Sequence, residues 1–367
     1  MQSGKLRIGI IGCGGIANQK HLPSLSKLGE LCELVAFCDI IPDRATAAAA
    51  KYGTPDARCY EDYHELLQDE SIDVVHVLTP NVAHSPITVA AFAAGKHVLC
   101  EKPMAHTYTD ALAMVQAAEK AGKLFTIGYQ NRFRDDTQTL HKACRAGDLG
   151  DIYFAKAHAV RRRAVPTWGV FPNKALQGGG PLIDIGTHAL DITLWMMDNY
   201  EPARVTGSVF HKMGDQCEGN IFGPWDPATF EVEDSAFGFV QMKNGATIFL
   251  ESSWALNVTD SREAATTLCG TKAGAEIKGG MSYGPGYELT FNRAKHGKLM
   301  EEKVSGGGAI AYFSGGNNEP GVVEARQWLL AIRDGGQPLV QPHQALVVTQ
   351  ILEAIYKSHD TGKTIEF

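Results

Sequence analysis

The sequence lacks the features that mark several large classes of protein. Its eight cysteines form no C-x-x-C pair and no Cys/His cluster at metal-ligand spacing, so we expect reduced thiols and no bound metal. No stretch approaches the roughly 18 to 20 uninterrupted apolar residues that a membrane span requires. The polar start leads straight into a short apolar strand and lacks the longer apolar core of a secretory signal. We therefore expect a cytoplasmic protein with no membrane partner.

An excess of positive charge is also missing. The chain carries 34 Lys and Arg residues against 41 Asp and Glu residues, which gives a formal net charge of -7. Nucleic-acid binding normally depends on a basic surface, so this balance argues against a nucleic-acid partner and favours a small ligand. The 367 residues, 44% of them hydrophobic, are typical of a globular chain that is too long for one core. Two domains are expected.

A glycine-rich turn follows the first predicted strand. Residues 5–11 (KLRIGII) are an apolar run, and the next six residues (GCGGIA) lead into a segment that can be helical. In G-x-G-x-x-A the first glycine permits a tight turn, the second lets the backbone approach a pyrophosphate, and the small alanine allows close helix packing. A structural turn alone would give the same pattern, but its context favours a dinucleotide site. The predicted contacts are Gly12, Gly14, Gly15 and Ile16.

An acidic residue ends the second predicted strand. Asp39 follows residues 32–38 and lies close to the spacing from the glycine turn at which a carboxylate accepts hydrogen bonds from the adenosine ribose. Its charge would repel a 2′-phosphate, so we expect NAD rather than NADP. Two alternatives stay open, because Arg44 could meet such a phosphate and an Asp at a strand end often serves only as a helix cap.

Strands and helices alternate through residues 1–130, which predicts a Rossmann domain with a doubly wound parallel sheet. Ligands of such sheets lie beyond the carboxyl ends of the strands. Polar clusters follow three of the predicted strands, and although each could be a mere turn, all fall on this rim. The residues that we expect to contact the cofactor there are Thr79, Asn81, His84, Glu101, Lys102 and Asn131. Arg132 is expected to reach the substrate.

After residue 130 the pattern changes to longer β-type runs with two late helices, near residues 322–334 and 344–358. This predicts a C-terminal α+β domain over residues 131–367, with an open, mainly antiparallel sheet covered by helices on one face. The other face is expected to be a dimer surface. The predicted strands are residues 151–160, 203–212, 235–243, 247–254, 266–270 and 275–278.

An Asp/His pair stands in a predicted helix of this second half. A glycine run over residues 178–180 and Pro181 precede LIDIGTHALD, in which Asp184 and His188 are four residues apart. On a helix this spacing places both side chains on one face, where the carboxylate could orient the imidazole and raise its basicity for general-base work. The competing interpretation is a solvated polar helix face.

A basic and aromatic loop precedes that helix. Arg163 ends a run of three arginines, and Trp168 offers an apolar ring face suited to a sugar, so both are predicted substrate contacts. A solvated basic loop with an anchoring tryptophan explains the pattern equally well. Tyr283 and the glycines at 306–308 could form a lid, although no chemical argument supports one.

These motifs, taken in order, resemble the glucose-fructose oxidoreductase / inositol dehydrogenase (Gfo/Idh/MocA) family over essentially the full length. The resemblance rests on GCGGIA at residues 12–17, T-P-N-x-x-H at 79–84, E-K-P at 101–103 and D-x-G-x-H at 184–188. It implies a homodimer or homotetramer that acts on sugars or cyclitols. It also implies a catalytic trio of Lys102, Asp184 and His188, with a Lys102-Pro103 bond that is often cis in the family.

The hypothesis is therefore an NAD-dependent dehydrogenase that moves a hydride between a secondary hydroxyl of a sugar, cyclitol or sugar derivative and nicotinamide. Lys102 would hydrogen-bond the reacting oxygen, and His188 would take the hydroxyl proton. Two alternatives remain. One is an NAD-dependent glycoside hydrolase of the same family, which oxidises its substrate transiently before elimination. The other is a non-catalytic NAD and sugar sensor, which the complete acid-base set disfavours.

Overall fold

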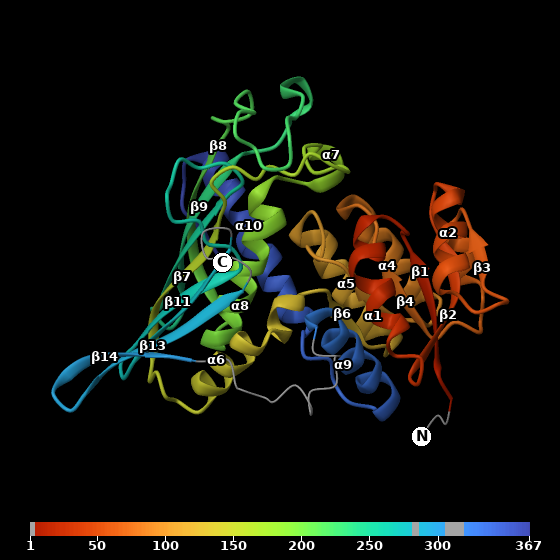
Figure 1. Ribbon diagram of the computed structural model, residues 1–367, viewed down its shortest axis with the longest axis horizontal. Coiled ribbons are helices and arrows are strands. Elements are labelled where there is room, and N and C mark those ends of the chain that lie inside the picture. Colours follow the sequence, from red (N-terminus) through yellow and green to blue (C-terminus); the bar gives the residue numbers. More distant parts are fainter. Residues whose placement is uncertain (1–3, 281–285, 305–318) are drawn as a thin grey trace. The chain divides into compact units, whose positions relative to one another are not determined.

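The computed structural model describes residues 4–280, 286–304 and 319–367 (Figure 1). The chain forms two compact units, each of which combines two stretches of sequence. The first unit holds Met1–Phe133 and Ala309–Leu346, and the second holds Arg134–Gly308 and Val347–Phe367. Tyr283 and the glycines at 306–308 lie outside the described residues, so the prediction of a lid stays a prediction.

The first unit is built on a six-stranded parallel sheet with the order β3-β2-β1-β4-β5-β6. This is the doubly wound order expected for a Rossmann domain, and it reverses direction between β1 and β4. The strands are β1 (Leu6–Ile11), β2 (Cys32–Cys38), β3 (Arg58–Tyr60), β4 (Val74–Val77), β5 (His97–Cys100) and β6 (Phe125–Ile127).

Helices flank this sheet and bury its apolar strands. They are η1 (Ala17–His21), α1 (Leu22–Ser26), α2 (Pro42–Tyr52), α3 (Tyr63–Leu67), η2 (Asn81–Ala83), α4 (His84–Ala93), α5 (Tyr108–Ala121) and η3 (Gln130–Phe133). A late helix, α9 (Pro320–Asp334), adds Val322, Trp328 and Leu329 to the buried cluster formed by β1, β2 and α1. The core of this unit therefore needs residues from both ends of the chain, whereas we predicted one continuous N-terminal domain.

The second unit contains a nine-stranded mixed sheet in the order β14-β13-β12-β11-β7-β10-β9-β8-β15. Only β7 and β10 pair in parallel among its described strands, so the sheet is mainly antiparallel, as predicted. Its strands are β7 (Ile152–Val160), β8 (Pro202–Phe210), β9 (Ser235–Met242), β10 (Thr247–Ser253), β11 (Ala265–Gly270), β12 (Gly274–Gly279), β13 (Tyr287–Lys295), β14 (Lys298–Lys303) and β15 (Ile365–Glu366).

The two faces of this sheet differ sharply. Figure 1 shows α8 (Thr187–Met197) and α10 (Pro342–Thr361) beside the strands on one side. Contact there is so close that a side chain at Gly207 or Gly238 would collide with Ile355 of α10. On the opposite face, Phe239 and Phe249 stand cross-strand from each other and remain 40% and 44% exposed. The remaining helical segments of this unit are α6 (Asp135–Arg145), α7 (Lys174–Gln177), η4 (Leu182–Gly186) and η5 (Pro227–Thr229).

Three strands of this sheet were not predicted from the sequence: β13, β14 and the two-residue β15. The β13–β14 hairpin turns at His296 and Gly297, which both have positive φ (54° and 71°). Such a two-residue turn matches the twist of paired strands, and His-Gly lies outside the Asn-Gly and Asp-Gly pairs that usually reveal it.

Three expected absences can be compared with the described part of the chain. All eight cysteines are free. In the described ranges no group of His, Cys, Asp or Glu side chains is placed to hold a metal ion. None of the described helices is both long and apolar enough to cross a membrane.

Candidate active site

The glycine turn lies at the point where the strand order of the first unit reverses. Gly12 has φ +94°, and a Cβ there would lie 2.6 Å from the carbonyl oxygen of Leu78, so this position requires glycine. A Cβ at Gly14 or Gly15 would meet nothing within 4 Å. The backbone at these two glycines is therefore open to a ligand, and a helical backbone follows directly from Gly15 into η1. A pyrophosphate fits this cradle.

Asp39 has a structural role at the glycine turn. Its carboxylate accepts hydrogen bonds from the backbone N–H of Cys13 (2.8 Å) and of Ile41 (2.9 Å), and its residue is 8% exposed. Arg44 Nη1 lies 4.0 Å from Asp39 Oδ1, the oxygen that accepts from Ile41, and the Arg44 side chain is half-exposed. Asp39 thus ties the end of β2 to the glycine turn, which places its charge beside the expected ribose position.

His84 is fully buried between two loops at the carboxyl edge of the sheet. Its Nδ1 lies 2.8 Å from the carbonyl oxygen of Pro103, and its Nε2 lies 3.0 Å from that of Thr79. Burial lowers the pKa of His84, so the ring is neutral and donates one N–H at a time. We expected a cofactor contact, but the geometry instead gives His84 the task of linking these loops. Thr79 and Asn81 stay at the rim, with Asn81 8% exposed at the start of η2.

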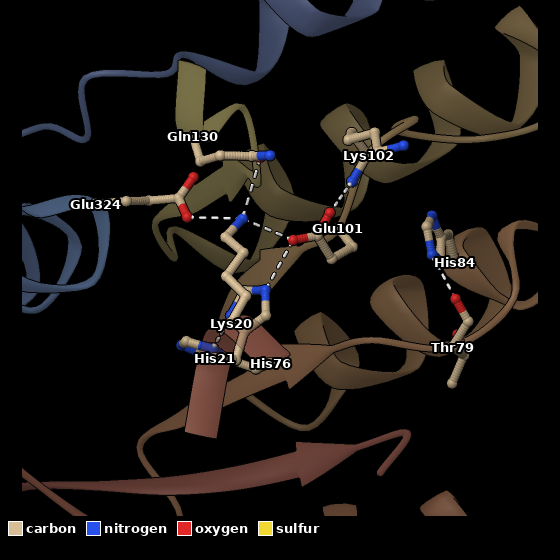
Figure 2. Close-up of polar contacts among 9 residues, drawn as sticks. All are labelled: Lys20, His21, His76, Thr79, His84, Glu101, Lys102, Gln130 and Glu324. Atoms are coloured by element: carbon tan, nitrogen blue, oxygen red, sulfur yellow. Dashed lines mark hydrogen bonds and ion pairs between the residues drawn. The ribbon is translucent and has the colours of Figure 1, made fainter. Parts of the chain in front are cut away.

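The Glu101-Lys102-Pro103 turn is held by a buried carboxylate (Figure 2). Glu101 Oε1 accepts from Lys20 Nζ and His21 Nε2, both at 2.7 Å, and its Oε2 accepts from the backbone N–H of Lys102 at 3.0 Å. Although burial opposes ionisation, the nearby Lys20 ammonium and the His21 hydrogen bond hold the pKa of Glu101 well below its ordinary value. The Lys102-Pro103 bond is cis, as the resemblance implied.

Arg132 occupies a different place from the one expected. It is fully buried, and its guanidinium donates to Gln344 Oε1 at 2.6 Å. A side chain without solvent access cannot meet an incoming sugar, so the expectation that Arg132 contacts substrate needs correction. Its neighbour Asn131 is partly exposed in η3 and stays at the rim.

The Asp/His pair lies in a helix whose first turn is unusually wide. Asp184 belongs to the π-helical segment η4, and His188 belongs to the first turn of α8. Both are buried, at 9% and 8% exposure. Asp184 Oδ2 accepts from the indole N–H of Trp254 at 3.0 Å. Single-turn π segments are frequent at functional sites, and the buried setting disfavours the solvated-face interpretation.

A second buried carboxylate fixes the beginning of this helix. Glu233 is 2% exposed and accepts from the backbone N–H of Gly180 (2.8 Å), from that of Leu182 (3.2 Å) and from the Tyr356 hydroxyl (2.7 Å). Burial raises the pKa of Glu233 and of Tyr356. A Cβ at Gly180 would lie 2.2 Å from the Glu233 carbonyl oxygen, which explains the glycine run before the helix.

A line of aromatic rings runs from Asp184 to the exposed loop of the second unit. Trp254 contacts Phe171 edge-on at 6.2 Å, and Phe171 contacts Trp168 at 5.9 Å. Trp168 is 51% exposed and also packs against Phe222 at 4.8 Å. Its ring face is therefore available at one end of a wall that leads to the Asp/His helix.

The arginines of the loop divide by function. Arg161 forms a two-pronged ion pair with Glu263, with N–O distances of 2.7 and 2.6 Å, and is structural. Arg163 donates to Asn257 Oδ1 at 3.0 Å and is partly exposed, so it keeps a position from which a ligand can be reached.

The sequence analysis missed four residues that support these groups. They are Lys20, Trp254, Glu233 and Glu324. Each lies more than 50 residues in sequence from the residues that it contacts, and none carries a local pattern of its own. Glu324 offered one signal, because a charged residue on the apolar face of a helix calls for a buried partner.

Family models match both parts of the chain. The oxidoreductase family with an NAD-binding Rossmann fold (GFO/IDH/MocA) matches residues 6–129, and the GFO/IDH/MocA C-terminal domain matches residues 137–276. The gap between the two matches covers residues 130–136.

Curated relatives include sugar and inositol dehydrogenases. A D-glucoside 3-dehydrogenase from Escherichia coli (strain K12) is 37% identical over 366 residues, which covers 100% of this chain and 99% of that protein. An inositol 2-dehydrogenase from Salmonella typhimurium is 32% identical over 54% of this chain and 57% of its own.

Solved structures share the fold over almost the whole chain. An aldose-aldose oxidoreductase from Caulobacter crescentus, complexed with glycerol, has a TM-score of 0.81 at 27% identity and covers 99% of this chain and 100% of its own. A levoglucosan dehydrogenase in complex with NADH and levoglucosan has a TM-score of 0.85 at 22% identity, with 99% of each chain covered.

Proposed function

Because the chain belongs to the GFO/IDH/MocA oxidoreductase family, we propose that it uses NAD to oxidise a secondary ring hydroxyl of a D-glucoside or a closely related sugar, at carbon 3. The general activity, nicotinamide-dependent oxidation of a sugar or polyol, is that of the family's dehydrogenases. The observation that carries the finer proposal is the 37% identity to a D-glucoside 3-dehydrogenase along the full chain.

The catalytic roles fall on Lys102, Asp184 and His188. Bound NAD supplies a hydride acceptor at C4 of its nicotinamide ring. His188 takes the proton of the reacting hydroxyl, and bound NAD would accept the hydride from the same carbon, so that the alcohol is oxidised to a ketone. Lys102 stabilises the negative charge that develops on the oxygen, where a fixed donor acts most strongly. Asp184, oriented by the Trp254 indole, supports the imidazole.

The preference for NAD over NADP rests on the end of β2. The buried Asp39 carboxylate is fixed by two backbone N–H groups, and its negative charge opposes a 2′-phosphate. Ile40, which follows it, is 87% exposed and offers an apolar surface with no hydrogen-bond donor for such a phosphate. Arg44 favours NADP instead, because its guanidinium could pair with a 2′-phosphate. Gly12, Gly14, Gly15 and Ile16 would hold the pyrophosphate, with Thr79, Asn81 and Asn131 along the rim.

The sugar is proposed to contact Trp168 and Arg163 in addition to the catalytic groups. An exposed indole face at the end of the aromatic wall suits the apolar face of a sugar ring. Arg163, held by Asn257, supplies donors for hydroxyl oxygens.

We also propose that the protein is a homodimer or homotetramer and that it is cytoplasmic. The open sheet face carries Phe154, Phe239 and Phe249 in mutual contact at 5.5 and 5.2 Å, a partly exposed apolar patch suited to a second copy. Replacing Phe239 and Phe249 with serine should lower the mass measured by light scattering. A reducing compartment fits eight free cysteines.

The test is an NADH-formation screen in which NAD and NADP run in parallel over D-glucosides, free hexoses, levoglucosan and inositols. The expected result is that a D-glucoside with NAD reacts fastest and yields a 3-keto product. Oxidation of an inositol in preference to every glucoside would reject the substrate, and a preference for NADP would reject the cofactor. Release of aglycone from an aryl glucoside without NADH growth would instead indicate the glycoside hydrolase, and tight NAD binding with no oxidation would indicate a sensor.

A further inference from the structure

A buried charged cluster lies behind the Lys102 turn, and we define it as Lys20, His21, Glu101 and Glu324 (Figure 2). Its members come from η1, from the end of β5 and from α9. All four residues are in the first unit. Neither the glycine turn nor the catalytic roles assigned above make use of Lys20 or Glu324.

Each of the three ammonium protons of Lys20 has a hydrogen-bond acceptor. Its Nζ lies 2.7 Å from Glu101 Oε1, 2.8 Å from Glu324 Oε2 and 3.3 Å from Gln130 Oε1. An ammonium has three donors, so each proton has an acceptor and the group is fixed from three directions. The two carboxylates raise the pKa of Lys20 against the effect of burial, so the side chain stays charged.

Glu101 connects Lys20 to the backbone of Lys102. Its carboxylate has no donor of its own when ionised, and it receives Lys20 and His21 on one oxygen and the Lys102 backbone N–H on the other. The carboxylate also leaves no room behind it, because a Cβ at Gly128 would lie 2.8 Å from Oε1. Rotation of Glu101 would therefore break several contacts together.

The far side of the same turn is tied independently. His84 lies 2.8 Å from the carbonyl oxygen of Pro103 and 3.0 Å from that of Thr79, and its one N–H donates to either of them, so a buried ring holds the backbone that follows Lys102. These anchors act on the backbone of the turn, and they fix the point from which the Lys102 side chain starts.

We propose that Lys20, acting through Glu101, is a positioning residue for Lys102, and that Glu324 supplies the second carboxylate that keeps Lys20 in place. This inference rests on the proposed function, because it takes Lys102 as the group that meets the reacting oxygen. It assigns Glu101 to turnover, whereas a cofactor contact would assign it to NAD affinity.

Lys20→Met tests the proposal, with Lys27→Met as the matched control. Lys27 is near the end of the same helical stretch and pairs with Glu319 at the surface, so its loss should change little. For Lys20→Met, kcat with the best sugar of the screen should fall about ten- to hundredfold, since small misplacements of a reacting group cost this much. NADH affinity by fluorescence titration should change less than about threefold. Loss of NADH affinity with kcat unchanged would overturn the proposal.

Glu101→Gln sharpens the test. An amide has one acceptor oxygen and one NH₂ group, so the NH₂ must face either the Lys102 N–H or the Lys20 and His21 donors. Hydrogen exchange of a peptide covering residues 99–104 should then become at least about tenfold faster, and the same is expected for Lys20→Met but not for Lys27→Met. Unchanged exchange in both variants would overturn the proposal.

Failure to fold is covered by Lys20→Met combined with Glu324→Gln. The double variant removes the buried charge that Lys20→Met leaves unpaired, so thermal stability should recover while kcat stays low and exchange stays fast. Recovery of kcat together with stability would show a purely structural role and overturn the proposal. Lys102→Met separates the two levels: if it keeps full turnover, the proposed function fails, and the exchange data alone then decide whether Lys20 orders the turn.

Discussion

The two stretches that we propose to be catalytic are supported in different ways. The Lys102 turn is held by the ion pair of the Glu101 carboxylate with the Lys20 ammonium and by the buried rings of His21 and His84. The Asp184–His188 helix is held mainly by uncharged donors: two backbone N–H groups and a tyrosine hydroxyl on Glu233, and an indole on Asp184. In the proposed mechanism, the Lys102 ammonium stabilises charge on the reacting oxygen, which requires a fixed backbone at the base of its side chain. The His188 imidazole is proposed to take a proton, which requires a fixed ring. The difference in support follows the difference in task.

The largest expected effect comes from removing the Lys102 ammonium or the His188 imidazole. Lys102→Met and His188→Asn should each lower kcat by about a hundredfold or more, the usual scale for acid-base and electrostatic groups. NADH affinity by fluorescence titration should stay within about threefold. A loss confined to one of the two variants would break the comparison, because both stretches are assigned to the same step.

The charged cluster should show itself in the pH dependence of stability. Burial raises the pKa of Glu324 from 4.5 to about 7, with Lys20 acting in the opposite direction and Glu101 adding to the rise. Between these two pKa values the folded state binds more protons than the unfolded state, so the free energy of unfolding falls as pH rises through this window. At about 1.4 kcal/mol for each pKa unit, the loss amounts to about 3 kcal/mol.

Denaturant titrations of the wild type and Glu324→Gln check this slope. The wild type should lose stability relative to the variant between about pH 5 and about pH 8. Glu319→Gln, at the exposed start of the same helix, is the control and should keep the slope of the wild type. Parallel curves for the wild type and Glu324→Gln would contradict the assignment.

In the Asp184–His188 helix, the support from Glu233 can be tested. Glu233→Gln should destabilise the protein by about 2 kcal/mol, because the amide NH₂ would face a buried donor. Glu231→Gln is a close control, since the exposed Glu231 accepts a backbone N–H from Lys174 at 3.1 Å. Thermal unfolding measures the difference. Equal melting temperatures for the two variants would remove Glu233 from the support of the helix.

The smallest expected effect is that of the indole on Asp184. Trp254→Phe keeps the buried ring but deletes its N–H, which should lower kcat about tenfold, equivalent to the loss of about one hydrogen bond to a charged group. Trp225→Phe deletes a comparable indole bond, to Gly214 at 2.7 Å, and should leave kcat unchanged. Equal kcat values for the two variants would show that Asp184 needs no such donor.

Local motifs predicted much of the molecule. The glycine turn, the alternating elements and the D-x-G-x-H segment each consist of neighbouring residues whose order has a direct steric or electrostatic meaning, and the Rossmann order and the mainly antiparallel sheet are confirmed. His84 was predicted to contact the cofactor and Arg132 the substrate, and the structure gives both a different place. Their polar side chains turned out to be buried against Pro103 and Gln344, a partnership that no local pattern reveals.

The sequence by itself determined where the chain turns, which residues can bear a proton or a phosphate, and which family it joins, because these depend on the chemistry of residues close together in the chain. Only the tertiary structure decided which of those polar residues stay accessible at the rim and which are buried as anchors. Burial and hydrogen bonding are set by partners far away in sequence, as when α9 brings Glu324 to Lys20. In the sequence, the carboxylate of Glu101 beside Lys102 looks the same whether it contacts a ligand or anchors the backbone. Its hydrogen-bond partners in the fold distinguish the two roles.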